Sequence, residues 1–220
     1  MEQLPGAAPH GNFQPDKVVT GEPTFITLDL ETTDLIRGGI MPHITQIAAA
    51  DIKSNTCFAV YCKPKVPICS EVQKITGISL NDDGDMVVNG RCVESLDIKL
   101  ALEQLCTWLL NFKTSKLYII AHNGQMFDMP VLMTALKKTG TINSFLKAVS
   151  GCIDSLKVFR KKFPNRSHKQ KDLVFDLLGM TYESHNAEGD VKALGKLVNL
   201  CESSELLSAS FSPLAVINTL

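Results

Sequence analysis

Two acidic residues stand two positions apart in an otherwise apolar segment of the chain. Residues 25–33 read FITLDLETT, with Asp29 and Glu31 at positions i and i+2. On a β-strand these side chains leave the same face, because successive residues point to opposite sides of the sheet. Like charges held that closely repel, and partial burial adds a desolvation cost that surface acids avoid. The spacing therefore predicts that a positive group binds at this place.

Two more acids and a histidine lie in segments far along the chain. Asp128 follows the turn AHNGQMF and comes just before Pro130, so by itself it is typical of a helix cap. Asp190 lies in SHNAEGDVKALGKLVNLC, in the first turn of an expected helix, where an acid often complements the helix dipole. His185 precedes Asp190 by five residues, in the approach to that helix. Considered alone, each of these residues has an ordinary structural interpretation.

Considered together, the four acids and the histidine predict metal-dependent chemistry at phosphorus. Hard divalent cations such as Mg²⁺ and Mn²⁺ prefer oxygen ligands, and a pair of them clamps the attacking and leaving oxygens of an in-line displacement. Imidazole titrates near neutral pH, so a neutral histidine can take the proton of an attacking water. We therefore expect two Mg²⁺ or Mn²⁺ ions and a general base at the following residues: Asp29, Glu31, Asp128, Asp190 and His185.

The order of these motifs resembles that of the DEDDh 3′–5′ exonucleases. Residues 29–31 match D-x-E, residues 123–132 match N-G-x-x-[FY]-D-x-P-x-L, and residues 185–190 match H-x-A-x-x-D. The segments KITGIS, CIDSL and SHNAEGDVKAL narrow the resemblance to the three-prime repair exonucleases, and the chain is also similar to the exonuclease-like region of some promyelocytic leukaemia proteins. The likeness covers roughly residues 24–203. One such motif alone is weak evidence, whereas all of the catalytic identities in order are strong evidence.

The resemblance implies a fold and a role for each acid. It implies an α/β protein with an RNase H-like fold, in which a central five-stranded mixed sheet is flanked by helices. Asp29, Glu31 and Asp190 are expected to hold the first metal ion. Asp29 is expected to share the second ion, with Asp128 acting through water. The implied reaction is hydrolysis of the 3′-terminal phosphodiester of single-stranded or frayed duplex DNA, which releases nucleoside monophosphates.

Residues near these motifs are expected to contact the substrate. Leu35, Ile75 and Phe127 match residues that pack on the terminal bases in the repair exonucleases. Stacking on apolar side chains needs no particular base sequence, which suits an enzyme that moves along any strand. Core packing is an equally good interpretation of Leu35 and Ile75. Thr32 and Asn123, inside the matching motifs, are the other nucleic-acid contacts expected in this region.

One residue departs from the family pattern. Asp34, in ETTDL, occupies a place where these exonucleases usually have glycine. Glycine adopts positive φ freely, and aspartate is one of the few other residues that tolerates it. We therefore expect the turn to survive. We also expect the added negative charge, beside the path of a polyanion, to lower the activity.

A basic segment lies between the second and third acidic motifs. Residues 157–171 contain no acid, in a chain whose net charge is −1. Runs of charge usually mark a solvated face, but a run this one-sided favours contact with phosphates, and it can also serve as a weak nuclear import signal. The expected phosphate-binding residues are Lys157, Arg160, Lys161, Lys162, Arg166, Lys169 and Lys171.

The composition indicates the class of protein and its compartment. A chain of 220 residues with 45% hydrophobic content is long enough for one well-buried domain. Its seven cysteines are odd in number and lack C-x-x-C spacing, which favours a reducing intracellular compartment, the nucleus or the cytoplasm. No apolar run approaches the roughly 18 residues that span a bilayer, so we expect a soluble protein without a membrane partner.

The elements that must position these residues are predicted from the periodicity of apolar side chains. Early strands followed by βα alternation predict a mixed sheet flanked by helices. The expected strands are 24–31, 43–52, 56–64 and 116–121, of which the first three form an antiparallel meander. The expected helices are 95–112, with Ser95 as its cap, 128–138, 154–163, 172–178 and 187–202.

The expected exonuclease domain, residues 24–203, has a segment of different composition on each side. Residues 1–23 hold four prolines and three glycines without an apolar period, so we expect a flexible N-terminal tail. Residues 204–220 are expected to be a C-terminal tail, which is either loose or packed on the body.

Other functions stay open at this point. A non-catalytic module that binds nucleic acid or protein partners has the same fold, but a degenerate copy would be expected to lose at least one catalytic group, and none is lost. A proofreading or RNA-trimming exonuclease would use the same chemistry, although the sequence beside KITGIS argues against this alternative. The repair exonucleases commonly pair through a sheet edge, so a homodimer is the alternative to a monomer.

Overall fold

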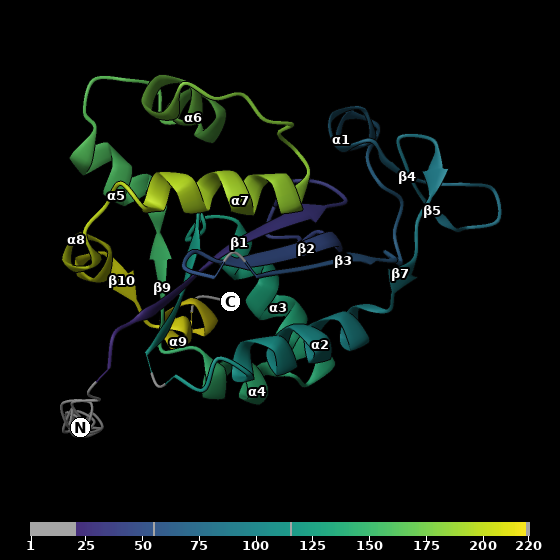
Figure 1. Cartoon of the computed structure of the whole chain (residues 1–220). Helices are drawn as coiled ribbons and strands as arrows, with labels where there is room; N and C mark the ends of the chain where they lie inside the picture. The colour runs from purple at the N-terminus through teal and green to yellow at the C-terminus, as the bar shows by residue number, and fades with distance from the viewer. Residues whose placement is uncertain (1–20, 55, 115, 219–220) are drawn as a thin grey trace, which may run out of the picture.

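The computed structural model describes residues 21–54, 56–114 and 116–218 of the 220-residue chain. The expected N-terminal tail covers residues 1–23, of which residues 1–20 lie outside the described residues. Figure 1 shows a sheet with helices on both faces and a smaller group of strands at one end. The elements are β1 (Thr24–Thr32), β2 (Ile44–Asp51), β3 (Cys57–Cys62), α1 (Ser70–Thr76), β4 (Ile78–Leu80), β5 (Met86–Val88), β6 (Arg91–Cys92), β7 (Ser95–Leu96), α2 (Ile98–Leu110), β8 (Leu117–Ala121), α3 (Asp128–Thr139), α4 (Ile142–Ala148), β9 (Gly151–Asp154), α5 (Ser155–Lys162), α6 (Gln170–Leu178), α7 (Ala187–Val198), α8 (Ser203–Ser208), β10 (Ser210–Phe211) and α9 (Pro213–Ile217).

The main sheet has seven strands in the order β10-β9-β8-β1-β2-β3-β7. β2 runs antiparallel to both of its neighbours, β1 and β3, which confirms the expected meander. β8 runs parallel to both β1 and β9, so the sheet is mixed, as expected. The expected number of five strands is wrong, because β7 and β10 each add a strand of two residues at one edge. Such short strands show no alternating or apolar pattern by which the sequence could reveal them.

The alternation of side chains along β1 divides the protein into two layers. Its even-numbered apolar residues belong to the larger core cluster, which they share with residues of α2 and α3. The odd-numbered row begins with Phe25, which packs with residues of α6 and α7, and continues through Thr27 to Asp29 and Glu31. Figure 1 shows α7 crossing this second face of the sheet, with α5 and α6 on the same side. Asp29 and Glu31 therefore leave β1 on the face that α7 covers.

Small side chains let α7 lie close to the sheet. Ala48 and Ala50 of β2 form a buried cluster with Ala187 and Val191 of α7. Because an alanine side chain is a single methyl group, the backbone of the helix can approach the strands closely. The first turns of α7 therefore lie against the central strands.

Two buried polar contacts hold α7 in one position. The Thr27 hydroxyl lies 2.9 Å from the carbonyl oxygen of Val191 and 3.2 Å from that of Ala50. Gln46 Oε1 accepts the backbone N–H of Ala187, the first residue of α7, at 3.0 Å. A buried polar group without a partner is costly, so both contacts disfavour any sliding of α7 along the sheet.

The start of α2 differs from the expected one for a local reason. α2 begins at Ile98, because the Asp97 carboxylate accepts the backbone N–H of Lys99 at 2.8 Å and caps the helix. Ser95, the expected cap, lies in β7 instead. An Asp and a Ser are equally good caps, so the sequence alone did not distinguish them.

The C-terminal residues up to 218 pack on the body of the protein. α7 ends before Asn199 and α8 follows, so the expected single helix over 187–202 is shorter. β10 pairs antiparallel with β9, and Val216 of α9 lies in the larger core cluster. Of the tail expected at 204–220, the described part therefore forms a helix turn, an edge strand and a packed helix.

Replacing Thr27 with valine is expected to lower the free energy of unfolding by about 1–3 kcal/mol, because the variant keeps the shape but loses a buried hydroxyl that bonds α7 to the sheet. Urea unfolding followed by circular dichroism measures the change. Thr107→Val is the matched control, since the Thr107 hydroxyl is exposed and bonds Glu103 of its own helix, and we expect a change within about 0.5 kcal/mol. Equal losses in the two variants would contradict the role given to Thr27.

Candidate active site

Three carboxylates converge where the end of β1 meets the first turn of α7. Asp29 and Glu31 come from β1, and Asp190 comes from α7. One oxygen of each carboxylate lies within 4.8 Å of an oxygen of the other two. Hard divalent cations prefer oxygen donors at such spacing, so this set of ligands fits Mg²⁺ or Mn²⁺.

Asp128 lies beside these three acids but in a different position. It is buried at the start of α3, where Phe127 rather than Asp128 is the cap. Its Oδ1 accepts the backbone N–H of Leu30 at 3.2 Å. That N–H is available because the pairing of β1 with β8 ends at Thr27. Asp128 is thus held against β1, next to the group of three but not at the same mutual spacing.

Burial raises the pKa of all four acids, and the charges of neighbouring acids add to the rise for Asp29, Glu31 and Asp128. The pKa of Glu31 rises to about 8 and that of Asp128 to about 7, in both cases mainly because burial disfavours the charged form. Burial, followed by the charges of Asp128, Asp190 and Glu31, raises the pKa of Asp29 well above its ordinary value. A bound cation would reverse these shifts, which is the behaviour expected of a metal site.

Neutral hydrogen-bond donors surround the Asp190 carboxylate. Its Oδ1 accepts the Tyr182 hydroxyl at 2.7 Å and Gln170 Nε2 at 3.1 Å, and its Oδ2 accepts the backbone N–H of His185 at 2.8 Å. Burial raises the pKa of Asp190, and the bonds from Tyr182 and His185 oppose that rise. Sequence reasoning missed Tyr182 and Gln170, because no spacing rule connects either residue with Asp190.

His185 stands at the entrance to α7 with its side chain exposed. Its φ of +67° is left-handed, and its backbone N–H points to Asp190. The next residue, Asn186, caps α7 by accepting the N–H groups of Glu188 and Gly189. The turn and the cap together hold His185 at the edge of the acidic site.

A second set of buried polar residues, also missed from the sequence, supports the turn before Asp128. Asp154 is buried at the end of β9, and its Oδ2 accepts the backbone N–H of Gln125 at 3.2 Å. His122 lies 3.0 Å from Ser155 Oγ and 2.8 Å from the backbone carbonyl oxygen of His168. These contacts join the turn 122–127 to β9 and to the basic segment. In the sequence, only Asp154 of CIDSL and His122 of AHNG could have indicated these contacts.

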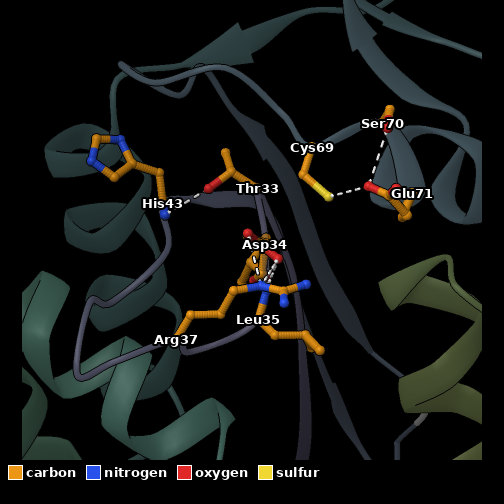
Figure 2. A network of polar contacts seen from close by, with 9 residues as sticks. Thr33, Asp34, Leu35, Arg37, His43, Cys69, Ser70 and Glu71 are labelled. Carbon is orange, nitrogen blue, oxygen red and sulfur yellow. Dashed lines mark hydrogen bonds and ion pairs between the residues drawn. The ribbon is translucent and has the colours of Figure 1, made fainter.

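Backbone contacts fix the end of β1 between two neighbouring segments (Figure 2). Thr33 donates its N–H to the carbonyl oxygen of His43 at 2.8 Å, and its hydroxyl accepts the N–H of His43 at 3.0 Å. The carbonyl oxygen of Thr33 accepts the N–H of Cys69 at 2.9 Å, and the Cys69 thiol donates to Glu71 at 3.0 Å. The residues after Glu31 are therefore joined to both β2 and α1.

The charge of Asp34 is paired, as Figure 2 also shows. Its Oδ1 accepts the backbone N–H of Leu35 at 2.7 Å and Arg37 Nε at 3.0 Å, and both bonds lower the pKa of Asp34. Asp34 is not among the described residues that have positive φ, so the turn needs no left-handed residue at this place. The expected need for a tolerant residue is thus wrong, and Arg37 offsets the negative charge that we expected beside the substrate.

Two of the expected base contacts are exposed. Leu35 is 61% exposed and Ile75 is 56% exposed, which excludes core packing for both. Phe127 is half-buried and packs against the larger core cluster. Met126, which precedes it, is 70% exposed and was not identified from the sequence. The side chains of Leu35, Ile75 and Met126 are therefore accessible to solvent.

Thr32 and Asn123 hold turns beside the site. Thr32 is buried, and its hydroxyl donates to the carbonyl oxygen of Asp34 at 2.7 Å. Asn123 is exposed and adopts a φ of +59°, in the turn that leads to α3. Asparagine adopts this left-handed conformation more readily than most residues, which explains its place in the motif.

The basic residues divide into two groups. Lys162 is paired with an acid, and its ammonium lies 2.6 Å from Glu205 of α8. Lys157 Nζ bonds Gln125 of the turn before Asp128. Lys169 and Lys171 are exposed on either side of Gln170, whose amide contacts Asp190. The other members of the run, Arg160, Lys161 and Arg166, are also exposed.

Comparison with known proteins identifies the family. The exonuclease family model, of RNase T type, matches residues 26–198 of this chain. The chain belongs to the exonuclease family. Mouse three prime repair exonuclease 2 is 25% identical over 218 residues, which cover 84% of this chain and 86% of the mouse protein. The resemblance stated from the motifs is thereby confirmed.

Members of this exonuclease family also occur as parts of larger proteins. The PolC-type DNA polymerase III of Caldanaerobacter subterraneus is 26% identical over 190 residues, which cover 82% of this chain but 12% of the polymerase. E. coli exonuclease I, solved in complex with a dT13 oligonucleotide, matches with a TM-score of 0.65 at 18% identity, over 83% of this chain and 41% of that chain. The structural match confirms the expected RNase H-like fold.

Metal-free protein is expected to lose stability as the pH rises from about 5 to 8. The pKa of Glu31 in the folded protein is about 8, above its ordinary value, so the protonated carboxyl group stabilises the folded state. This stabilisation is complete below the pKa of Glu31 in the unfolded chain and is lost as the pH rises through its pKa in the folded protein. Glu31→Gln removes this titration and should raise the free energy of unfolding at pH 8 by roughly 2 kcal/mol or more, with a smaller change at pH 5.

Urea unfolding in EDTA at the two pH values measures this difference. Glu94→Gln is the matched control, because Glu94 is exposed and lies in the loop before β7. Wild type and Glu31→Gln should diverge with rising pH, whereas wild type and Glu94→Gln should stay parallel. If all three proteins respond to pH alike, the buried acids are not the cause.

Proposed function

We propose that this chain is a metal-dependent 3′–5′ exonuclease that hydrolyses the 3′-terminal phosphodiester of single-stranded or frayed duplex DNA and releases nucleoside monophosphates. The convergence of Asp29, Glu31 and Asp190, with Asp128 buried beside them, carries the proposal. Membership of the exonuclease family supports the class of reaction. The chain spans under half of exonuclease I and a small part of the polymerase, so the activity is assigned from this chain's own site.

The acids have separate roles in this proposal. Asp29, Glu31 and Asp190 would hold a first Mg²⁺ or Mn²⁺ ion, Asp29 would also contribute to a second, and Asp128 would act through water. When bound, the two ions supply positive charge to the attacking and leaving oxygens at phosphorus. The raised pKa values support this assignment, because buried acids that repel one another are the arrangement that a cation stabilises.

His185 acts as the general base in the proposed reaction. It takes a proton from the attacking water at a ring nitrogen, and its exposed side chain can release that proton to solvent. The bond from its backbone N–H to Asp190 keeps the ring beside the acids while leaving both ring nitrogens free of that contact.

Exposed lysines hold the nucleic-acid strand by its phosphates in this proposal. Lys157 lies next to the turn before Asp128, and Lys169 and Lys171 flank a residue that contacts Asp190, so all three can neutralise phosphates close to the acids.

The terminal bases are assigned to three side chains, Leu35, Ile75 and Phe127. The exposure of Leu35 and Ile75 supports this assignment, since an apolar side chain must be accessible to stack on a base. Thr32 and Asn123 would shape the turns on which these contacts stand.

DNA is favoured over RNA in this proposal. The mouse relative is a repair exonuclease, and the exonuclease I complex contains a deoxyribonucleotide strand. The choice depends on whether a 2′-hydroxyl clashes with the groove or is hydrogen-bonded by it. No helix among the described residues is long and apolar enough to cross a membrane. The nucleus or cytoplasm remains the predicted compartment.

A homodimer through the edge of the sheet also remains a prediction. β7 pairs with β3 at Tyr61 and Cys62, which are the last residues of that strand. The earlier residues of β3 can therefore offer their backbone groups to a second copy of the chain.

Purified protein with Mg²⁺ is expected to shorten a 5′-labelled single strand one nucleotide at a time, and EDTA should stop the reaction. Asp190→Asn and His185→Ala should each lower kcat by about 100-fold or more while keeping the fold, because each removes a group that acts on the reacting atoms. Asp176→Asn, an exposed acid on α6, is the matched control and should retain activity. Degradation that survives EDTA or Asp190→Asn would refute the metal mechanism, and equal rates on matched RNA would refute the preference for DNA.

Removing the lysines beside Gln170 should change the salt dependence of strand binding. Each phosphate that a lysine neutralises contributes about 0.7 to the slope of log K against log salt for a single strand, so Lys169→Ala with Lys171→Ala should reduce the slope by about 1.4. Fluorescence anisotropy with a labelled oligonucleotide in Ca²⁺ measures the slope. Lys162→Ala belongs to the same run but removes only an ion pair with Glu205, and its slope should match wild type. Equal slopes in both variants would remove the basis for placing phosphates along this segment.

A further inference from the structure

Asp190 lies in a closed group of side-chain hydrogen bonds that neither motif spacing nor family membership assigns. Tyr182 donates its hydroxyl to Asp190 Oδ1 at 2.7 Å. Gln170 Nε2 lies 3.1 Å from the same oxygen, 3.0 Å from the Asp190 carbonyl oxygen and 3.0 Å from the Tyr182 hydroxyl. The three residues come from the start of α6, the loop that follows it and the first turn of α7. Each of the three therefore contacts both others.

The donor and acceptor roles in this group are determined by chemistry. An ionised carboxylate and a carbonyl oxygen only accept hydrogen bonds, so the atom of Gln170 that faces both must be its NH₂ group. The Tyr182 hydroxyl gives its single hydrogen to Asp190 and accepts from Gln170. The NH₂ group of Gln170 has two hydrogens and three acceptors within 3.1 Å, so at least two of these acceptors share one hydrogen. The N–H bonds of Gln170 and the O–H bond of Tyr182 all point toward Asp190 or toward its partner.

These bonds leave Asp190 able to bind a cation. A carboxylate has about four lone-pair sites, and Asp190 uses two on Oδ1 and one on Oδ2, where His185 donates its backbone N–H. An oxygen of Asp190 still lies within 4.8 Å of oxygens of Asp29 and Glu31. The donors therefore restrict the rotation of the carboxylate without filling the space between the acids.

The charge of the donors is as informative as their geometry. A lysine or arginine in contact with Asp190 would cancel the negative charge that attracts a divalent ion. Tyr182, Gln170 and the backbone N–H of His185 are all neutral, so they fix the orientation of the carboxylate without bringing a positive charge that would compete with a cation. The basic residues on either side, Lys169 and Lys171, are exposed and form no ion pair with Asp190 within the described part of the chain.

We propose that Tyr182 and Gln170 are positioning residues, which hold the Asp190 carboxylate in the orientation that binds a divalent ion. The inference rests on the proposed function, since it concerns the same site. Outer hydrogen-bond partners of metal ligands commonly affect metal affinity by about 10- to 100-fold. Both residues donate to Asp190 Oδ1, so in this proposal both act through that carboxylate.

The test measures Mn²⁺ binding by isothermal titration calorimetry on folded, metal-free protein. Tyr182→Phe keeps the ring and removes only the hydroxyl, and we expect its affinity for Mn²⁺ to fall about 10- to 100-fold. Tyr118→Phe is the matched control, because Tyr118 lies on β8 and packs beside the ring of Phe25. Its affinity for Mn²⁺ should equal that of wild type.

A second variant guards against loss of the fold. Gln170→Leu changes the first residue of α6 and should also weaken Mn²⁺ binding about 10-fold, with a melting temperature close to wild type. Both variants should show a lower kcat on a short oligonucleotide at limiting Mn²⁺, an unchanged KM for the strand, and recovery of kcat as Mn²⁺ is raised. A role in the fold alone would give no such recovery.

The outcomes separate this inference from the proposed function. If wild type binds Mn²⁺, if Asp190→Asn weakens that binding, and if folded Tyr182→Phe and Gln170→Leu bind as tightly as wild type, then the positioning role is overturned and the proposed function stands. If wild type does not bind Mn²⁺, or if Asp190→Asn binds as wild type does, then the metal site fails and the positioning role fails with it.

Discussion

The contact between α7 and the centre of the main sheet decides where the acids lie. The Thr27 hydroxyl donates to the carbonyl oxygen of Val191. Thr27 is two residues before Asp29 and Val191 directly follows Asp190, so this hydrogen bond lies next to both carboxylates. Gln46 holds the start of the same helix from the neighbouring strand. If α7 shifted by one turn, about 5.4 Å, Asp190 would leave the other acids. The acidic site therefore depends on a helix position that buried polar contacts and small side chains maintain.

That position carries an electrostatic cost. Burial raises the pKa of Asp29, Glu31, Asp128 and Asp190, so their ionised forms are disfavoured in the metal-free protein. Two apolar clusters on opposite faces of the sheet, together with the C-terminal helix and edge strand, provide stability that offsets this cost. A site of this kind is destabilising by itself and is retained where it serves a function.

The surroundings of the acids include contacts that the family motifs do not contain. Arg37 pairs with Asp34, so the two side chains together add no net charge to the turn after β1. The first residue of α6, Gln170, contacts Asp190 and stands between two exposed lysines. One short segment therefore links the orientation of a proposed metal ligand with the expected path of the phosphates.

The sequence by itself determined the long periodic elements and indicated which acids could bind a cation together. Long periodic segments such as β1 and α3 were predicted closely, because apolar periodicity records which face of an element is buried. The sequence also placed Asp29 and Glu31 on one face of β1, because side chains two residues apart on a strand point to the same side. Short elements were missed, among them β7 and β10, because two residues carry no periodic pattern.

Only the tertiary structure decided the distances between elements. The bond between Thr27 and Val191 joins residues 164 positions apart, and no local pattern encodes it. The same holds for the separate position of Asp128 and for the contacts of Tyr182 and Gln170 with Asp190. A side chain's direction follows from its own strand or helix, whereas its neighbours depend on how those elements pack and on which buried polar groups must find partners.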